Sequence, residues 1–177
     1  MSAGTITFAP VTRGDYPILA LWLERPHWRE WWGEPEIELG YIRDMVEGRD
    51  DTCRPFIASI DGVPAAYIQV WRVAPHQTPE WAEESPWLMQ LPAEAVGVDL
   101  SLADGDRLGQ GLGSAILRAF VARLRAEGHR TIVIDPDPTN LRAIRAYGKA
   151  GFRPMPEVTA GRHDARLMQH HSDDITS

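Results

Sequence analysis

The sequence predicts an α/β protein with a mixed central β-sheet of about six to seven strands flanked by about four helices. Two observations carry this prediction. An Asp61-Gly62 turn joins two apolar segments, which is typical of an antiparallel hairpin. Further along the chain, short apolar segments alternate with amphipathic ones, which indicates a right-handed crossover and a locally parallel pair of strands. Both kinds of strand pairing in one chain make the sheet mixed.

Length and composition restrict the class of protein. With 177 residues, 44% of them hydrophobic, the chain is long enough for one core, so we expect a single domain over residues 1–177, ordered over about 5–170. The single cysteine, Cys53, excludes an internal disulfide framework, and no zinc-ligand spacing is present, so we expect no metal. The formal net charge of −7 argues against a general nucleic-acid binder. The lack of a membrane-length apolar run or a signal peptide predicts a cytoplasmic protein.

The N-terminal quarter is expected to supply one strand and two helices. Residues 6–11 alternate loosely as a strand, and residues 12–15 offer capping side chains for a helix that continues to Leu23. Pro26 is expected to end or kink that helix. A second helix is predicted over residues 36–46, with an apolar stripe made of Ile37, Tyr41, Ile42 and Met45.

Three tryptophans lie close together between these helices. We interpret Trp28 as a core anchor. The adjacent Trp31 and Trp32 cannot both point inward, so one of them is expected to line a pocket.

The strands expected on either side of the Asp61-Gly62 turn cover residues 55–60 and 63–72. Alternation in the second strand places Tyr67, Gln69 and Trp71 on one face. A face that carries glutamine and large amphipathic aromatics indicates the wall of a site more than a core.

The segment from Val73 to Pro92 is long and irregular. Loops of this length in compact domains are usually functional or disordered. Its acidic residues alternate with Trp81 and Trp87, which favours a flap over a substrate; the acidic residues are Glu80, Glu83 and Glu84. The alternative is that the tryptophans attach the loop to the core or to a second subunit.

The C-terminal half is expected to continue the sheet. A strand over residues 95–102 leads to a glycine loop and an amphipathic helix from Leu112 to Gly128, with Ile116, Leu117, Phe120, Val121 and Leu124 as its apolar positions. A short strand at 131–134 and a helix at 141–150 follow. Residues 152–158 and 165–169 are expected to finish the sheet as a hairpin around Gly161.

The glycine loop Gly109-Gln-Gly-Leu-Gly113 runs directly into a helix. Such a loop exposes backbone N–H groups at the positive end of the helix dipole, where a phosphate group binds well. It lacks the Gly-Lys-Ser/Thr of a P-loop and the spacing of a dinucleotide fingerprint. The loop therefore predicts a phosphate-bearing cofactor of another kind.

About one crossover later comes Asn140-Leu-Arg-Ala-Ile-Arg-Ala-Tyr147-Gly-Lys-Ala-Gly-Phe152. With this partner the chain resembles the GCN5-related N-acetyltransferase superfamily, in which the glycine loop binds the coenzyme A pyrophosphate and the second motif lies along the pantetheine. More narrowly, it resembles the aminoglycoside 6′-N-acetyltransferases through Glu30–Gly33, Tyr67-x-Gln69, Gly97–Leu102, Leu108–Gly113 and Asp135–Arg145. Leu108 departs from the Gln or Arg that usually begins the loop, so main-chain donors and the helix dipole would bind the pyrophosphate.

The resemblance implies acetyl-CoA as cofactor and direct acetyl transfer, in a ternary complex, to a primary amine of an aminoglycoside, at its 6′-position. It places acetyl-CoA against Ser101, Ala103, Leu108, Gly109, Gln110, Gly111, Leu112, Gly113, Ser114, Asn140, Ala143, Tyr147 and Lys149. The acceptor is expected to contact Trp31, Trp32, Gln69, Trp71, Glu80, Glu83, Glu84, Asp99 and Asp135.

Three residues are the candidates for chemistry. An alkylammonium with a pKa of about 10.4 must lose a proton before it attacks a thioester, and Asp99 is the candidate to accept that proton. The N–H of Ser101, which shares a strand face with Asp99, is expected to polarise the thioester carbonyl. Tyr147 is expected either to protonate the leaving thiolate or only to pack in its helix. Asp135 faces the acceptor or caps the next helix, a role that Asp137 would otherwise take.

Other functions remain open from the sequence. The acceptor would instead be a polyamine, a siderophore precursor or a protein N-terminus, or the chain would be a coenzyme-A-binding sensor without catalysis. A peptide acceptor needs a groove that offers backbone pairing, whereas this chain offers scattered carboxylates and aromatics. We expect a monomer or a homodimer.

Overall fold

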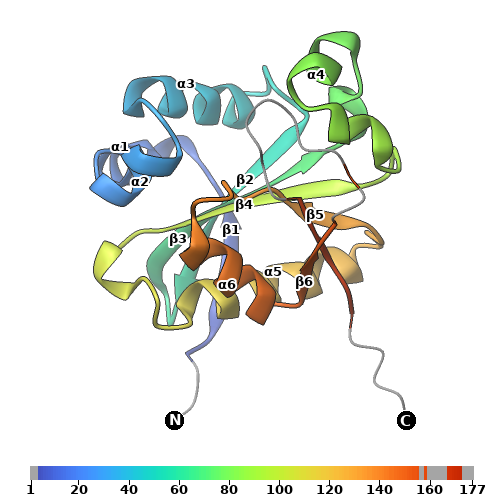
Figure 1. Cartoon of the computed structure of the whole chain (residues 1–177). Coiled ribbons are helices and arrows are strands. Elements are labelled where there is room, and N and C mark those ends of the chain that lie inside the picture. Colours follow the sequence, from blue (N-terminus) through green and yellow to red (C-terminus); the bar gives the residue numbers. More distant parts are fainter. Residues whose placement is uncertain (1–3, 156–157, 159–166, 173–177) are drawn as a thin grey trace.

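The computed structural model describes residues 4–155, 158 and 167–172. Its strands form one mixed sheet with the order β1-β2-β3-β4-β5-β7-β6. Figure 1 shows this sheet with helices around it. The strand bounds are β1 Ile6–Pro10, β2 Cys53–Ile60, β3 Val63–Arg72, β4 Val96–Leu102, β5 Ile132–Ile134, β6 Phe152–Pro154 and β7 Met168–His170. The strands β1 to β4 pair antiparallel and β5 pairs parallel to β4, so the predicted mixed sheet is confirmed.

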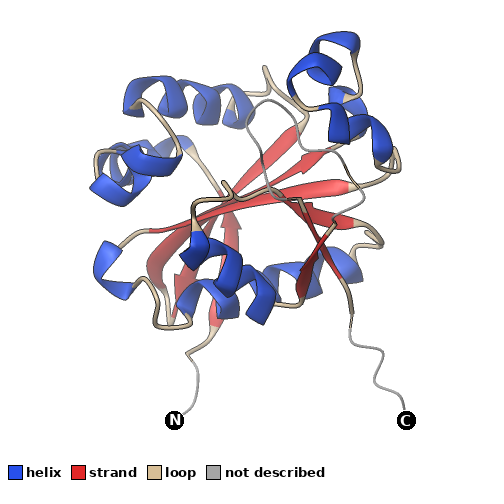
Figure 2. Cartoon of the chain, in the orientation of Figure 1, coloured by secondary structure: helices blue, strands red, loops and turns tan. Residues whose placement is uncertain are grey.

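Helices cover both faces of this sheet (Figure 2). Their bounds are α1 Tyr16–Leu23, α2 Pro26–Trp31, α3 Pro35–Val46, α4 Pro79–Glu84, α5 Leu112–Ala126 and α6 Leu141–Lys149. The described residues thus contain six α-helices, where the sequence predicted about four. The two additional helices, α2 and α4, each begin with proline, which is well suited to the first helical position because its missing N–H has no partner there anyway. No helix in the described ranges is both long and apolar enough to cross a bilayer.

The hairpin between β2 and β3 forms where the sequence predicts it. Asp61 and Gly62 both have positive φ angles, 50° and 81°, as a two-residue type I′ turn requires. The turn sets the register in which Ile57 lies opposite Tyr67 and Pro55 opposite Gln69.

One core cluster lies between the sheet and helices α5 and α6. The predicted stripe of α5 is confirmed, because Ile116, Leu117, Phe120, Val121 and Leu124 are all buried there. They pack on the face of the sheet that carries Ile68 and Val98. This packing fixes α5, and therefore the glycine loop before it, against the end of β4.

A second cluster joins the opposite face of the sheet to α1, α2 and α3. Tyr67 and Trp28 are completely buried in it, so the interpretation of Tyr67 as part of a site wall is wrong. The predicted stripe of α3 is also wrong in part: Ile37 and Tyr41 are each 55% exposed. The helix instead packs on the sheet through Leu39, Ile42 and Val46, which follow the spacing i, i+3, i+7.

The strands β4 and β5 separate soon after they meet. Val96 lies opposite Ile132 and Gly97 opposite Val133, and the described residues show no further pairs between these two strands. The second half of β4 therefore leaves one edge open, and this opening positions the site described below.

The C-terminal strands also follow the prediction in outline. Strand β6 pairs antiparallel with β7, and β7 lies between β5 and β6. Gly161 and the rest of the predicted turn lie outside the described residues.

Candidate active site

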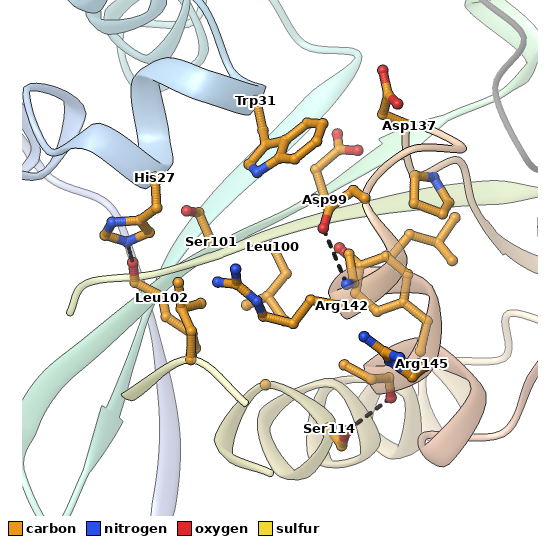
Figure 3. Close-up of a pocket in the computed structure, with 18 of the residues that line it drawn as sticks. His27, Trp31, Asp99, Leu100, Ser101, Leu102, Ser114, Asp137, Arg142 and Arg145 are labelled. Carbon is orange, nitrogen blue, oxygen red and sulfur yellow. Dashed lines mark hydrogen bonds between the residues drawn. The ribbon is translucent and has the colours of Figure 1, made fainter. Parts of the chain in front are cut away.

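A cavity of about 700 Å³ lies where β4 and β5 separate. Helices α2 and α3 and the end of β3 contribute to one side, and the glycine loop, α5 and α6 contribute to the other. Figure 3 shows Trp31 on the first side, Arg142, Arg145 and Ser114 on the second, and Asp99 and Ser101 between them. Segments from most of the described chain therefore meet at this one place.

The glycine loop supplies main-chain donors to the cavity. Gly109 and Gly111 have φ angles of 77° and 82°, a conformation that side chains disfavour, and both line the cavity directly before α5. A Cβ atom at either position would meet no other atom within 4 Å, so the glycines are required by the backbone turn. The turn directs the first N–H groups of α5 toward the opening.

Helix α6 adds positive charge to the same side of the cavity. Arg142, Arg145 and Lys149 follow the spacing i, i+3, i+7, which places them on one face of the helix, and all three line the cavity. Sequence reasoning identified Lys149 and missed both arginines, although the shared spacing would have revealed them. Leu108 carries no charge, and these three side chains are the arginines and lysine among the described residues that line the cavity.

Negative charge gathers where β4 and β5 separate and on α3. Asp99 follows Gly97 by two residues in β4, and Asp135 follows Val133 by two residues after β5. Gly97 and Val133 are register partners, so the side chains of Asp99 and Asp135 project from equivalent positions on the same face of neighbouring strands. Both line the cavity, together with Glu38 of α3, which sequence reasoning missed.

The two aspartates affect each other's protonation. Burial raises the pKa of Asp99, and hydrogen bonds from the side chains of Gln69 and Trp71 oppose that rise. Burial also raises the pKa of Asp135 well above its ordinary value, and the negative charge of Asp99 adds to the effect. The pair therefore holds protons more tightly than two solvated carboxylates would.

A chain of hydrogen bonds orients Asp99. The Tyr67 hydroxyl donates to Oε1 of Gln69 at 2.6 Å, and Nε2 of Gln69 donates to Oδ2 of Asp99 at 2.8 Å. Gln69 lines the cavity beside Asp99, as expected for a residue near the acceptor.

Trp71 lies behind Asp99 and is not among the residues that line the cavity. Its ring covers Gly97 so closely that a Cβ atom there would lie 2.1 Å from two ring carbons. The ring also packs at 6.3 Å from Trp87, within the third core cluster. The alternation of β3 correctly gave its face, but the ring packs over Gly97 and hydrogen-bonds Asp99, and it does not line the cavity.

The acidic segment predicted as a flap lies apart from the cavity. Its three glutamates are exposed on α4 and do not line the cavity; they are Glu80, Glu83 and Glu84. Trp87 is only 3% exposed and packs with Val73 and Leu88. The alternative interpretation is therefore correct for Trp87, which attaches this segment to the core.

Trp31 and Trp32, the adjacent tryptophans that were both expected to contact the acceptor, line the cavity, so the expectation that only one of them faces a pocket is wrong. The Trp32 ring packs against Trp28 and Tyr67, at 5.4 and 5.5 Å between ring centroids. Trp32 also lines the cavity. Trp31 is 39% exposed at the end of α2. The buried Trp28, which the sequence predicted as a core anchor, donates through Nε1 to the Leu102 carbonyl at 2.9 Å.

The prediction for the Ser101 N–H group is wrong. The N–H of Ala103 donates to Ala65, toward β3, whereas the N–H of Val96 donates to Thr131, toward β5. Because these directions alternate along a strand, the N–H of Ser101 faces β3, and the N–H groups of Leu100 and Leu102 face the open edge. Ser101 itself is 8% exposed and lines the cavity.

The open edge of β4 is partly covered at its end. His27 of α2 lines the cavity, and its Nε2 lies 2.7 Å from the Leu102 carbonyl oxygen. Since a carbonyl only accepts, this ring nitrogen carries the hydrogen. Together with Trp28, His27 fastens α2 to β4.

The residues expected to contact the cofactor divide into two groups. Those that line the cavity are Ser101, Leu108, Gly109, Gly111, Gly113, Ser114, Asn140, Ala143, Tyr147 and Lys149. Ala103, Gln110 and Leu112 do not. Ala103 is buried in the second core cluster, Gln110 donates to the Asp106 carbonyl at 2.8 Å, and Leu112 packs against the first core cluster.

Two polar residues, Asn140 and Ser114, stabilise α6 and attach it to α5. Asn140 caps α6, because its side chain accepts from the N–H of Ala143 at 3.2 Å. Ser114 Oγ donates to the Ala146 carbonyl at 2.8 Å. The capping alternative for Asp135 is therefore wrong, and Asp137 instead forms a local turn with Thr139.

Tyr147 packs against the first core cluster and also lines the cavity, so it does more than pack in its helix, and its role as a proton donor stays a prediction. Burial raises the pKa of its hydroxyl, and the charges of Asp99 and Asp135 raise it further. The hydroxyl is therefore protonated at neutral pH and available as a donor.

Comparison with known proteins agrees with this geometry. Residues 12–160 match the family model described as acetyltransferase (GNAT) domain. An aminoglycoside N(6′)-acetyltransferase type 1 of Klebsiella pneumoniae is 35% identical, over 89% of this chain and 79% of its own length. A solved structure of AAC(6′)-Ib with paromomycin and acetyl-CoA has a TM-score of 0.80 and 31% identity, with 98% of each chain covered. A second, with coenzyme A and kanamycin, has a TM-score of 0.76 and 34% identity, with 94% of each chain covered. The chain is thus a member of the GNAT acetyltransferase family.

Proposed function

We propose that this protein transfers the acetyl group of acetyl-CoA to the 6′-amine of an aminoglycoside. The observation that carries the proposal is the division of charge within one cavity. Main-chain donors of the glycine loop and the cations of α6 line one part of the cavity, and the carboxylates of Glu38, Asp99, Asp135 and Asp137 line it as well. The first part is complementary to a ligand that carries phosphates, and the carboxylates are complementary to one that carries several ammonium groups.

Acetyl-CoA fits the first part of the cavity. The left-handed glycines leave the space beside the loop free of side chains, and the N-terminus of the 15-residue helix α5 faces it. We assign the pyrophosphate to the N–H groups of Gly109 to Gly113, with Arg142, Arg145 and Lys149 as the neighbouring cations. When bound, the cofactor supplies an activated acetyl thioester.

The residues of the chain then divide the proton transfers between them. Asp99, oriented by Gln69, accepts the proton of the acceptor ammonium, so that the free amine forms the new C–N bond as the C–S bond breaks. The N–H groups on the open edge of β4, at Leu100 and Leu102, are the donors available to the thioester carbonyl. Tyr147 donates its hydroxyl proton to the leaving sulfur, and the second proton, which the amine nitrogen loses as the amide forms, restores the Tyr147 hydroxyl directly or through water.

The direct test is Asp99→Asn with kanamycin as acceptor. Because the substitution keeps the side-chain shape and removes the base, turnover is expected to fall by about 10²- to 10⁴-fold while acetyl-CoA binding is unchanged. The matched control is Asp51→Asn, since the Asp51 side chain is 89% exposed on the surface. Unchanged turnover of the Asp99 variant would contradict the role given to Asp99.

A panel of acceptors tests the substrate class. Thiol release from acetyl-CoA is measured with aminoglycosides that carry either an amine or a hydroxyl at the 6′-position, with a polyamine and with a peptide that has a free N-terminus. Release is expected only with the 6′-amine compounds. Preference for the polyamine or the peptide would assign a different acceptor, and binding of coenzyme A without any release would indicate a sensor.

A further inference from the structure

Glu38 is a half-buried carboxylate of the acidic part of the cavity, and no individual role has yet been assigned to it. It lies in the first turn of α3, is half-buried and lines the cavity that also holds Asp99 and Asp135. The buried stripe of α3 begins at its neighbour Leu39, so Glu38 lies beside that stripe, on the border between core and cavity. Within the described part of the chain, no hydrogen bond or ion pair joins its carboxylate to another residue.

The position is electrostatically unfavourable in the protein alone. Burial raises the pKa of Glu38, and the charge of Asp99 raises it further. An enclosed carboxylate normally has a cation or a hydrogen-bond donor beside it, because desolvation without such a partner destabilises the charged form. The charged group that acts on the Glu38 carboxyl is therefore acidic, and no arginine or lysine lowers its pKa.

The helix dipole does not explain the placement of Glu38. Glu36 lies in the same first turn of α3, where a carboxylate interacts favourably with the N-terminus, and it is exposed to solvent outside the cavity. A purely stabilising glutamate would serve equally well at the exposed position. The position of the Glu38 side chain at the cavity therefore indicates that it interacts with a ligand bound there.

We propose that Glu38 binds a second ammonium group of the acceptor while the reacting amine faces Asp99. This inference rests on the proposed function and adds a residue that selects acceptors with at least two ammonium groups. The two carboxylates come from separate elements, α3 and β4, so together they fix both the position and the orientation of a dication. Trp31 and Trp32, which line the cavity beside α3, present flat apolar surfaces against which a sugar ring packs.

The matched variants are Glu38→Gln and Glu36→Gln. Both remove one negative charge from the first turn of α3 and keep the length of the side chain, but only the first changes the cavity. KM and kcat are measured for each with kanamycin and with 6-amino-6-deoxyglucose, which has a single amine.

For Glu38→Gln, the KM for kanamycin is expected to rise about 10- to 100-fold, as for loss of a charge-assisted contact, while kcat stays within about twofold. The KM for the monoamine is expected to stay unchanged, as are both constants of Glu36→Gln. Equal effects on both acceptors, or no effect on kanamycin, would overturn the proposal. A lower melting temperature of Glu38→Gln with an unchanged KM ratio would assign the residue a structural role and overturn it as well.

Calorimetric binding of kanamycin distinguishes this inference from the proposed function. If the wild-type protein binds kanamycin and does not acetylate it, the proposed function fails, and about tenfold or greater weakening in Glu38→Gln still supports the inference. If acetylation occurs and both glutamine variants bind kanamycin like the wild type, only the inference fails.

Discussion

The contact between Gly97 and Trp71 gives a prediction that connects stability with catalysis. Gly97 lies in β4 between Trp71 of β3 and Val133 of β5. A Cβ atom at Gly97 would lie 2.1 Å from Cε2 and Cζ2 of the indole, whereas ordinary van der Waals contacts lie at 3.4–4 Å. Gly97→Ala therefore forces the ring to move by roughly 1–2 Å.

The ring has little room for such a movement. It packs against Trp87 and His76, at 6.3 and 5.5 Å between ring centroids, and hydrogen-bonds Asp99. Overpacking of this kind destabilises a protein by about 1–3 kcal/mol. For a chain of this length, that corresponds to a melting temperature lower by roughly 2–12 °C.

The same movement changes the base. The hydrogen bond from Trp71 lowers the pKa of Asp99, so its loss raises that pKa further. Asp99 acts as a carboxylate, and a higher pKa means that activity is lost at a higher pH during acidification. The acid limb of the profile of kcat/KM against pH is therefore expected to shift upward in Gly97→Ala.

Urea denaturation and the pH profile measure both effects. The control is Gly40→Ala in α3, where a Cβ atom would meet nothing within 4 Å and where alanine is expected to stabilise the helix by about 0.5–1 kcal/mol. If Gly97→Ala were as stable as the wild type and kept its pH profile, the close contact with Trp71 and its influence on Asp99 would both be refuted.

Two further predictions concern the groups around Asp99. The pKa of Asp135 is raised in the folded protein, so the native state binds its proton more tightly than the unfolded chain does, and stability falls as pH rises from the unfolded to the native pKa. Asp135→Asn is expected to remove this decline, which amounts to at most about 1.4 kcal/mol per pH unit for one proton, in urea denaturation series at several pH values. A decline that persists in the variant would contradict the assignment. Tyr147→Phe keeps the ring and removes the hydroxyl, so turnover is expected to fall by up to about 10²-fold, with coenzyme A affinity unchanged by calorimetry. Unchanged turnover would leave Tyr147 with a packing role alone.

Local patterns in the sequence were sufficient for most elements of the fold. The Asp61-Gly62 turn requires two positive φ angles in succession, and the apolar stripe of α5 follows the helical period, so neighbouring residues alone determine both features. The glycine loop and the cap at Asn140 are local in the same sense. The sequence therefore identified the glycine loop and the motif after it, which line the same cavity, and placed Asp99 near them.

What the sequence could not determine depends on how distant elements meet. Because β4 separates from β5, the N–H groups of Leu100 and Leu102 face the cavity, whereas the N–H group of Ser101 faces β3. The rotation of α3 about its axis brings Glu38 into the cavity, and the absence of a side chain at Gly97 lets the Trp71 ring pack against β4 at that position. A periodic pattern reports which face a residue occupies, whereas only the packing of one element on another decides what that face meets.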